Sequence, residues 1–301
     1  MAVDAFLLLL GMIALGKLAA KTGRFPESAA EVLNRFVIDI CLPAAVLRYA
    51  SRLELDAGLL QLVAVPWLLC AATAVGVLFV AKRVALSAER TAVLLLCVPL
   101  GNTAFLGYPL TRALLGESAL SYAVVYDQFG SFLLLTTWGL WVLARYGGDR
   151  QPTMGEIAGR IVRFPPFLAL AVALTVMPAA PPPVVDVVLA RLSDALFPIV
   201  TFAVGLQIKL RLPRHQLGPL AAGLGIKLVL LPLAAWGLVG LLGIEGVAGQ
   251  VAVVESAMPP MVTAGALASS HRLAPELAAA LVGYGAVLSL ITLPLWRLLL
   301  G

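Results

Sequence analysis

The sequence has few charged residues for its length, and this scarcity excludes most soluble folds. Charged side chains make up 12% of the 301 residues, hydrophobic ones make up 61%, and the mean hydropathy is +1.00. A soluble domain needs about a quarter of its residues charged to cover its surface. A lipid-facing surface must instead be apolar, and its backbone must satisfy its hydrogen bonds internally. The composition therefore predicts an integral membrane protein in a lipid bilayer.

Cysteine is also scarce, and its positions exclude two further classes of structure. Cys41, Cys70 and Cys97 fall inside apolar runs without paired spacing, so we predict neither disulfides nor a zinc site. The net charge of +5 comes from short basic clusters between apolar runs, a pattern that orients a chain in lipid and does not indicate nucleic acid. No glycine-rich phosphate loop, nucleophile elbow or metal-ligand cluster is present. We expect no enzyme and no cofactor.

Apolar runs recur along the whole chain at about 20 residues each, the length that a helix needs to cross the hydrocarbon of a bilayer. They predict an all-α integral membrane fold of ten transmembrane helices with short loops. The expected spans are residues 4–20, 30–49, 58–81, 91–114, 119–145, 157–178, 184–208, 218–241, 247–270 and 275–299. The first run follows Asp4 and lacks a basic start, so we interpret it as a retained helix and not as a signal peptide.

Basic residues are distributed unevenly over the predicted loops. If both termini are outside, the inner loops hold 14 lysines and arginines, and the outer loops hold 4, namely Arg48, Arg52, Arg112 and Arg297. Loops with an excess of positive charge stay on the inner side of a membrane. The bias therefore predicts a multi-pass protein of the inner (plasma) membrane with both termini outside.

The two halves of the chain share a short pattern. Asp39 and Asp194 each stand four residues before a proline, and each follows an arginine, Arg35 or Arg191, at helical spacing. This spacing favours intrahelical ion pairs, so we interpret both acids as structural.

Broken spans recur at a similar offset, because proline and glycine interrupt the fourth predicted span and proline interrupts the ninth. Five spans in each half reverse the direction of the chain, which predicts two inverted five-helix repeats. We place the first repeat at residues 1–150 and the second at 151–301, with a scaffold and a transport domain each drawing helices from both repeats.

The fourth span is interrupted between Pro99 and Pro109, where two prolines and two glycines fall within twelve residues. Proline removes a backbone donor and glycine weakens a helix, so the segment should unwind. The freed backbone groups cannot face lipid and must line a cavity or bond to protein. Gly101, Asn102 and Thr103 lie at this point. A merely kinked packing helix is the alternative.

The ninth span carries a carboxylate next to its break. Pro259 and Pro260 interrupt the helix, and Glu255 lies one turn earlier. A carboxylate at membrane depth must be paired, protonated or bound to a cation. Unwound carbonyls beside it are the oxygen ligands that hard cations favour. A buried glutamate that bonds helix ends is the alternative.

Two other polar residues lie at membrane depth. Asp127, followed by Gln128, stands in the middle of the fifth span, where ion binding and a structural hydrogen-bond role are both open. Lys227, near the middle of the eighth span, can pair with an acid, attract an anion or extend toward the interface.

Three strings of the sequence resemble the auxin efflux carrier family in its bacterial branch. They are Asn34–Val37 (NRFV) followed by Leu42–Pro43, Gly101–Leu110 (GNTAFLGYPL) and Glu255–Met261 (ESAMPPM). The resemblance covers nearly the whole chain. It implies two inverted five-helix repeats, as in the bile-acid sodium symporters, with the fourth and ninth helices broken and crossing near the midplane. It also implies that a scaffold and a mobile domain alternate access.

The resemblance implies a secondary active transporter. The long cytoplasmic loop of plant auxin carriers is absent, which argues against indole auxin as the substrate, and the resemblance to the bacterial branch implies small carboxylates such as malate or malonate. The expected substrate site is Gly101, Asn102, Thr103, Met258, Pro259, Pro260 and Thr263, where half-helix N-termini suit an anion. The expected sodium or proton site is Asn102, Asp127, Gln128, Glu255 and Ser256. An auxin-like or bile-acid-like hydrophobic anion, an ion channel and an intramembrane enzyme are the alternatives. A second copy of the chain, in a homodimer, is a candidate partner.

Overall fold

A computed structural model of the chain describes residues 2–26, 28–53, 57–148, 153–207 and 214–300. These residues form helices joined by short connections, and the one β contact among them is an isolated bridge between Gly101 and Pro260. The predicted all-α fold is confirmed. The predicted boundary between residues 150 and 151 lies outside the described residues.

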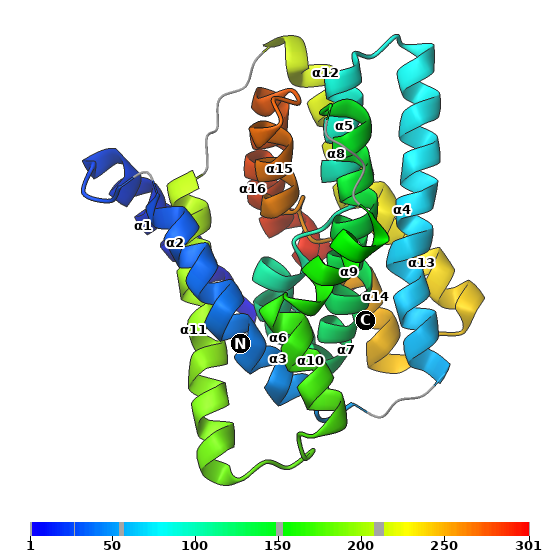
Figure 1. The fold of residues 1–301 in the computed structure, drawn as a ribbon. Helices are drawn as coiled ribbons and strands as arrows, with labels where there is room; N and C mark the ends of the chain where they lie inside the picture. The colour runs from blue at the N-terminus through cyan, green and yellow to red at the C-terminus, as the bar shows by residue number, and fades with distance from the viewer. Residues whose placement is uncertain (1, 27, 54–56, 149–152, 208–213, 301) are drawn as a thin grey trace.

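The first half of the chain begins with a long helix and ends with one that contains two π-helical stretches (Figure 1). Its elements are α1 (Ala2–Thr22), α2 (Ala29–Phe36), η1 (Val37–Cys41), α3 (Leu42–Ala50), α4 (Ala57–Arg83), α5 (Ala88–Cys97), η2 (Thr103–Gly107), α6 (Tyr108–Leu115), α7 (Ala119–Val125), η3 (Tyr126–Phe132), η4 (Leu135–Gly139) and α8 (Leu140–Tyr146).

The second half begins with a bent pair of helices and ends with a long one. Its elements are α9 (Met154–Val162), α10 (Pro165–Thr175), α11 (Pro183–Gln207), η5 (Arg214–Gln216), α12 (Leu217–Gly225), η6 (Ile226–Leu230), α13 (Leu231–Leu242), α14 (Gly246–Ser256), α15 (Val262–Ser270) and α16 (Pro275–Leu299).

Wide π-helical turns interrupt several of these helices at polar residues. Asp39 lies in η1, Asp127 in η3 and Lys227 in η6. A proline stands at the start of the helix after η1 and after η6, where its missing N–H removes an α-helical hydrogen bond. Single π-turns of this kind are common at functional sites.

Several helices are long and apolar enough to cross a membrane. In the described part of the chain, four qualify by length and composition: Gly58–Arg83, Pro183–Gln207, Leu217–Leu242 and Pro275–Leu299. The pair Met154–Val162 and Pro165–Thr175 makes a fifth if it is counted as one span. The ends of these helices lie within a few residues of the predicted ones.

The span predicted at residues 157–178 is bent, because α9 and α10 meet at an angle of 69°. Pro165 begins α10, and the residue before it, Phe164, is extended, as the proline ring requires. Helix α9 buries none of its residues and starts with a capping box between Thr153 and Glu156. It is a short surface helix joined to one that buries a single face, with Pro166, Ala169, Leu170 and Ala173.

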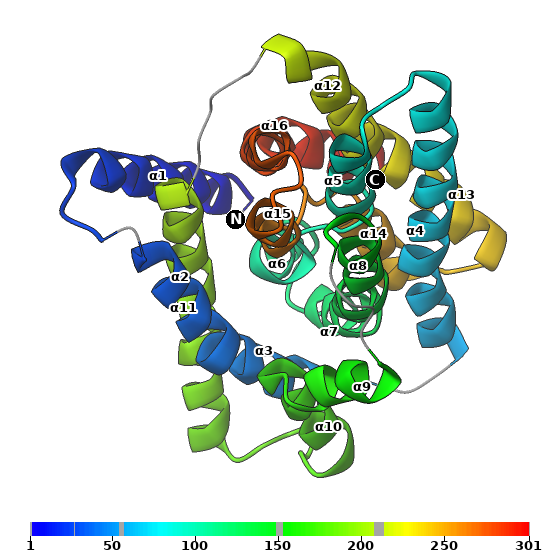
Figure 2. The same ribbon diagram turned by 45° about the horizontal axis from the view of Figure 1, so that its top comes forward.

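The buried apolar residues form two clusters. The larger cluster centres on α4, α5 and α12–α16, and the smaller one centres on α3, α7, α10 and α11. In Figure 2, α1, α2, α3, α10 and α11 lie on one side, α4 and α13 lie at the opposite edge, and α6, α14 and α15 lie between them. Each group contains helices from both halves of the chain.

Helix α1 packs along α11 through two glycines. An added Cβ at Gly16 would overlap the carbonyl of Phe202 and touch Gly205, and one at Gly205 would overlap the carbonyl of Ile13. Only residues without a side chain permit this approach of two backbones, as in other close helix pairs in membranes. The contact joins the first helix of one half to a long helix of the other.

We expect Gly16→Ala to lower the thermal unfolding temperature of the detergent-solubilised protein, because an overpacked methyl group costs about 1–3 kcal/mol. Gly11→Ala is the matched control on the same helix, since nothing lies within 4 Å of a Cβ at that position. Equal unfolding temperatures for the two variants would contradict the close contact.

Candidate site at the crossing of two broken helices

The two predicted breaks meet inside the protein. The Asn102 N–H donates to the Pro259 carbonyl over 2.8 Å, and the Met261 N–H donates to the Leu100 carbonyl over 2.9 Å. These bonds pair Gly101 and Pro260 in antiparallel orientation. The prediction that the chain leaves the helix at both places, and that the breaks approach each other, is confirmed.

Proline and the partner segment together account for the shape of each break. Helix α5 ends before Pro99, and α14 ends before Pro259 and Pro260, which have no N–H to continue a helix. After the first break, the carbonyl of Asn102 accepts from the N–H groups of Leu106 and Gly107. Each extended segment therefore finds its remaining hydrogen bonds in the other, as buried backbone requires.

Four half-helix ends point to this place. The carbonyl ends of α5 and α14 come before the breaks, and the N–H ends of η2–α6 and α15 follow them. Carbonyl ends carry partial negative charge and attract cations, whereas N–H ends attract anions. The crossing thus offers sites for ions of both signs.

Asp127 lies next to the first break and is almost completely buried. Its carboxylate accepts from Thr103 Oγ1 at 2.5 Å, Tyr108 Oη at 3.1 Å and Gln128 Nε2 at 2.7 Å. Three donors satisfy a buried carboxylate well. The residues that bond Asp127 come from η2, α6 and η3, so it ties the first break to the fifth predicted span.

Glu255 is fully buried in the last turn of α14 and is less well satisfied. Thr111 Oγ1 donates to its Oε1 at 2.8 Å, but its Oε2 has no hydrogen-bond partner. A Cβ at Gly107 would overlap this Oε2, so the glycine makes room for the carboxylate.

Lys227 contributes a buried ammonium group to the same place. Its Nζ donates to the carbonyl of Ser256, the last residue of α14, at 3.1 Å, and a Cβ at Gly101 would lie 3.0 Å from it. A positive charge at the carbonyl end of a helix is favourable. In the described residues Lys227 forms no ion pair with a carboxylate.

Buried polar atoms without a partner collect at the crossing. Within the described residues there are five such side-chain atoms, and three of them are Asn102 Nδ2, Gln128 Oε1 and Glu255 Oε2. Native proteins rarely leave these atoms unpaired, because each costs free energy. One donor and two acceptors are therefore available to a bound ligand.

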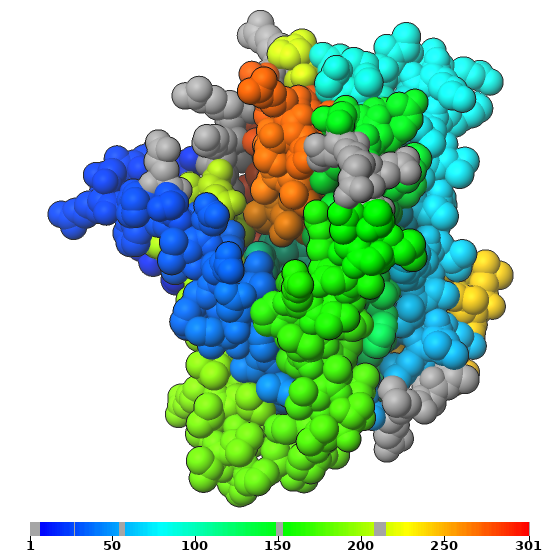
Figure 3. Space-filling model, in the orientation of Figure 1, coloured from blue at the N-terminus to red at the C-terminus, as the bar shows by residue number. Residues whose placement is uncertain are grey.

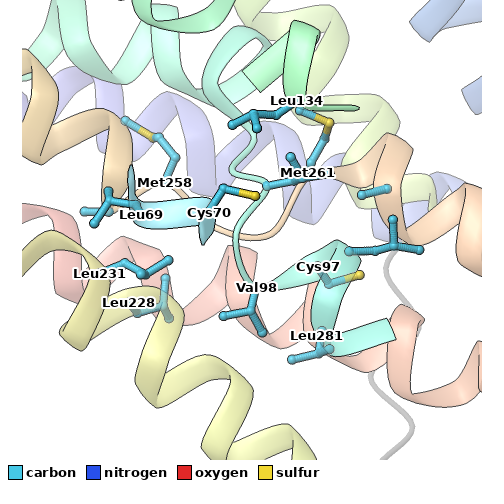
Figure 4. Close-up of a cluster of buried hydrophobic side chains, with 14 of the residues drawn as sticks. Leu69, Cys70, Cys97, Val98, Leu134, Leu228, Leu231, Met258, Met261 and Leu281 are labelled. Atoms are coloured by element: carbon cyan, nitrogen blue, oxygen red, sulfur yellow. The ribbon is translucent and has the colours of Figure 1, made fainter. Parts of the chain in front are cut away.

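The other predicted site residues differ in their roles. Ser256 Oγ donates to the carbonyl of Val253, so it caps the end of α14. Met258 and Met261 pack among apolar side chains such as Leu69 and Leu134 (Figure 4). Thr263 lies in the first turn of α15, beyond the break.

Tyr108, Thr111 and Gly107 are functional candidates that the sequence reasoning missed. The first two are three residues apart on α6 and so face the same side, and each binds one of the two acids. Polar residues at helical spacing after the broken GNT segment were the available signal.

The two aspartates that precede prolines have different partners. Arg35 Nε donates to Asp39 Oδ2 at 3.1 Å within one helix, which confirms the predicted pair. The predicted pair of Asp194 with Arg191 is wrong, because Asp194 binds Arg112 of α6 at 2.5 Å. Asp194 faces the half-helix that follows the first break, and Arg112 reaches it across the interface of α6 and α11.

A cavity lies along each of the half-helices that follow the breaks. One, of about 400 Å³, lies between α6, α1, α3 and α11 and includes Tyr108 and Arg112 in its wall. The other, of about 530 Å³, lies between α15, α16, α11 and the connection of α1 to α2, with Val262 in its wall. Figure 3 shows α15 in orange and α2 in blue on either side of the second cavity.

The sequence matches a known protein family over nearly its whole length. A model of the membrane transport protein family, which is the auxin efflux carrier family, matches residues 1–297. The chain belongs to this family. It is 30% identical to an uncharacterized transporter of Methanothermobacter thermautotrophicus, over 99% of this chain and 98% of the relative. A second uncharacterized transporter, from Methanocaldococcus jannaschii, is 26% identical over 98% of this chain and 97% of its own length.

Membership of this family, together with the apolar helices, identifies a multi-pass membrane transporter. The family resemblance of the three sequence strings is thereby confirmed. Two of those strings, Gly101–Leu110 and Glu255–Met261, contain the crossing segments.

Replacing Lys227 with Met keeps an unbranched side chain but removes the ammonium group. We expect a lower thermal unfolding temperature in detergent, because the end of α14 loses a charged hydrogen bond worth about 1.5–3 kcal/mol. Leu228→Met, at the next buried position of η6, is the control and should change little. An unfolding temperature for Lys227→Met equal to that of the parent would show that the ammonium group stabilises nothing.

Proposed function

We propose that this transporter carries small organic anions, carboxylates such as malate or malonate, by alternating access coupled to a cation. The observation that carries the proposal is the set of unpartnered buried polar atoms on Asn102, Gln128 and Glu255. They lie where two broken helices cross, and a cavity approaches the crossing along each half-helix.

The crossing suits a carboxylate. The N–H ends of η2–α6 and α15 lie beyond Asn102 and Met261, and helix N-termini favour anions. The amide of Asn102 has a free donor, and the ammonium of Lys227 lies beside Gly101. A substrate carboxylate held by Gly101, Asn102, Thr103 and the segment from Met258 to Pro260 would satisfy these donors.

The charges at the crossing suit one coupled cation. With Asp127 and Glu255 ionised and Lys227 protonated, the buried group carries one net negative charge, which is costly away from water. One sodium ion or one proton cancels it. The free oxygens of Glu255 and Gln128 are ligands that sodium accepts, so we place the ion against Glu255. Asp127, which already has three donors, would then act through Thr103 and Gln128.

Two bodies that share the crossing suit alternating access. We propose that the larger cluster around α4, α5 and α12–α16 moves against the group of α1, α3, α10 and α11, with residues 1–150 and 151–301 as inverted repeats. The division into two apolar clusters, each with helices from both halves, supports this arrangement.

Counterflow in proteoliposomes tests the proposal. We expect internal malate or malonate to accelerate uptake of labelled substrate, and external sodium to raise the rate. Glu255→Gln should abolish the effect of sodium while the protein stays folded, because the variant lacks the charge that holds the ion. Glu245→Gln, at the exposed start of the same helix, is the matched control.

Three other results would each change the proposal. Uptake without acceleration by internal substrate would indicate a channel. A rate that follows the pH gradient and ignores sodium would indicate a proton on Glu255. Acceleration by indole acetate or bile acids alone would replace the carboxylate substrate with a hydrophobic anion.

We also propose that both termini lie outside and that the connection from α8 to α9 lies inside, from the basic bias of the loops. A cysteine after Gly301 should react with an impermeant maleimide in intact cells, and Met154→Cys, at a position 80% exposed, should react only after lysis. The native cysteines are buried and give little background. Labelling of Met154→Cys in intact cells would reverse the orientation.

A further inference from the structure

Helix α6 connects the buried acids to the opposite side of the helix interface. Tyr108 donates to Asp127, and Thr111 donates to Glu255. The next residue, Arg112, binds Asp194 of α11. One short half-helix therefore touches both acids of the crossing and an acid of the other helix group.

The Arg112 guanidinium is available to a ligand in the cavity of about 400 Å³. Its Nη1 binds Asp194 Oδ1 at 2.5 Å, and its Nη2 is 3.8 Å from Glu117 Oε2. The side chain keeps 42% of its surface exposed, and Ser193, Asp194 and the two tyrosines Tyr49 and Tyr108 share the cavity wall. A volume of this size is in the range of small-molecule sites.

A carboxylate ligand has the same chemistry as the side chain of Asp194. Arginine binds carboxylates through a planar fork of donors, often with two parallel hydrogen bonds. At present Asp194 takes one edge of this fork through a single oxygen. A substrate carboxylate in the cavity can occupy the same donors and displace it.

We propose that this cavity is a carboxylate-binding site on the route to the crossing, in which the substrate displaces Asp194 from Arg112. The inference rests on the proposed transport of organic anions and adds a residue to it. Displacement breaks an ion pair between α6 and α11, and it does so on the helix that holds Thr111 against Glu255. Substrate binding therefore also breaks the ion pair that joins α6 to α11.

The first half of the chain supplies a natural control. Asp39 has the same position before a proline as Asp194, but it binds Arg35 of its own helix. That pair bridges no interface and lines a different cavity. Removal of its charge should leave the binding of carboxylates unchanged.

The test measures the binding of malonate and malate to the purified protein by thermal shift and titration calorimetry, with chloride as the control anion. We expect Arg112→Gln to raise the dissociation constant about tenfold or more, because the variant loses a charged contact worth at least about 1.4 kcal/mol. Asp194→Asn should lower the dissociation constant several-fold, because the carboxylate of Asp194 no longer competes with the ligand for Arg112. Asp39→Asn should bind like the parent.

The tighter binding expected of Asp194→Asn distinguishes a specific effect from misfolding, because a misfolded variant cannot bind the ligand more tightly than the parent. If the parent binds malonate or malate and Arg112→Gln binds it equally well, the site is elsewhere and this inference fails alone. If Asp194→Asn binds more weakly than the parent, Asp194 is no competitor and the displacement is wrong. If the parent binds neither carboxylate, the proposed substrate class fails, and this site fails with it.

Discussion

Two backbone hydrogen bonds between the broken helices are the constraint on which the rest of the centre depends. In lipid, an unpaired backbone group costs several kcal/mol, so a helix can open only where its groups find new partners. Leu100 finds its partner in Met261, and Asn102 finds its partner in Pro259. Neither break is stable without the other, which explains why the prolines occur in both halves of the chain. The half-helix ends, and the side chains that neutralise them, follow from this pairing.

The crossing leaves its two acids in different states of satisfaction. Asp127 has three donors, all from the first half of the chain, and its carboxylate is well satisfied. Glu255 has one donor and a free oxygen, and the lysine near it is engaged with the end of α14. A site with one incompletely satisfied acid has room for a ligand that comes and goes. This difference favours Glu255 over Asp127 as the place where a coupled ion binds.

The sequence predicted the features that depend on local chemistry. Apolar runs located the four long apolar helices of the described residues. Proline with glycine located both breaks, because these residues act on their own backbone. The roles of Lys227 and Thr111 could not be predicted, since their partners lie 29 and 144 residues away. The partner of Asp194 was predicted wrongly for the same reason: helical spacing favoured Arg191, and the tertiary contact placed Arg112 closer. The proline at the bend, Pro165, is present in the sequence. The uniform hydropathy of the region nevertheless favoured a single span.

The glycine contact between α1 and α11 has a consequence for the assembly of the protein during synthesis. Helix α1 is synthesised before α11, yet the surface that receives Gly16 belongs to α11, from the second half of the chain. The same delay applies to the first break, because its hydrogen-bond partners Pro259 and Met261 are synthesised more than 150 residues later. The helices that are synthesised early therefore lack these contacts until the later ones have been inserted into the bilayer. A chain that stopped before Pro259 would lack these partners and would leave the backbone of the first break unpaired in lipid.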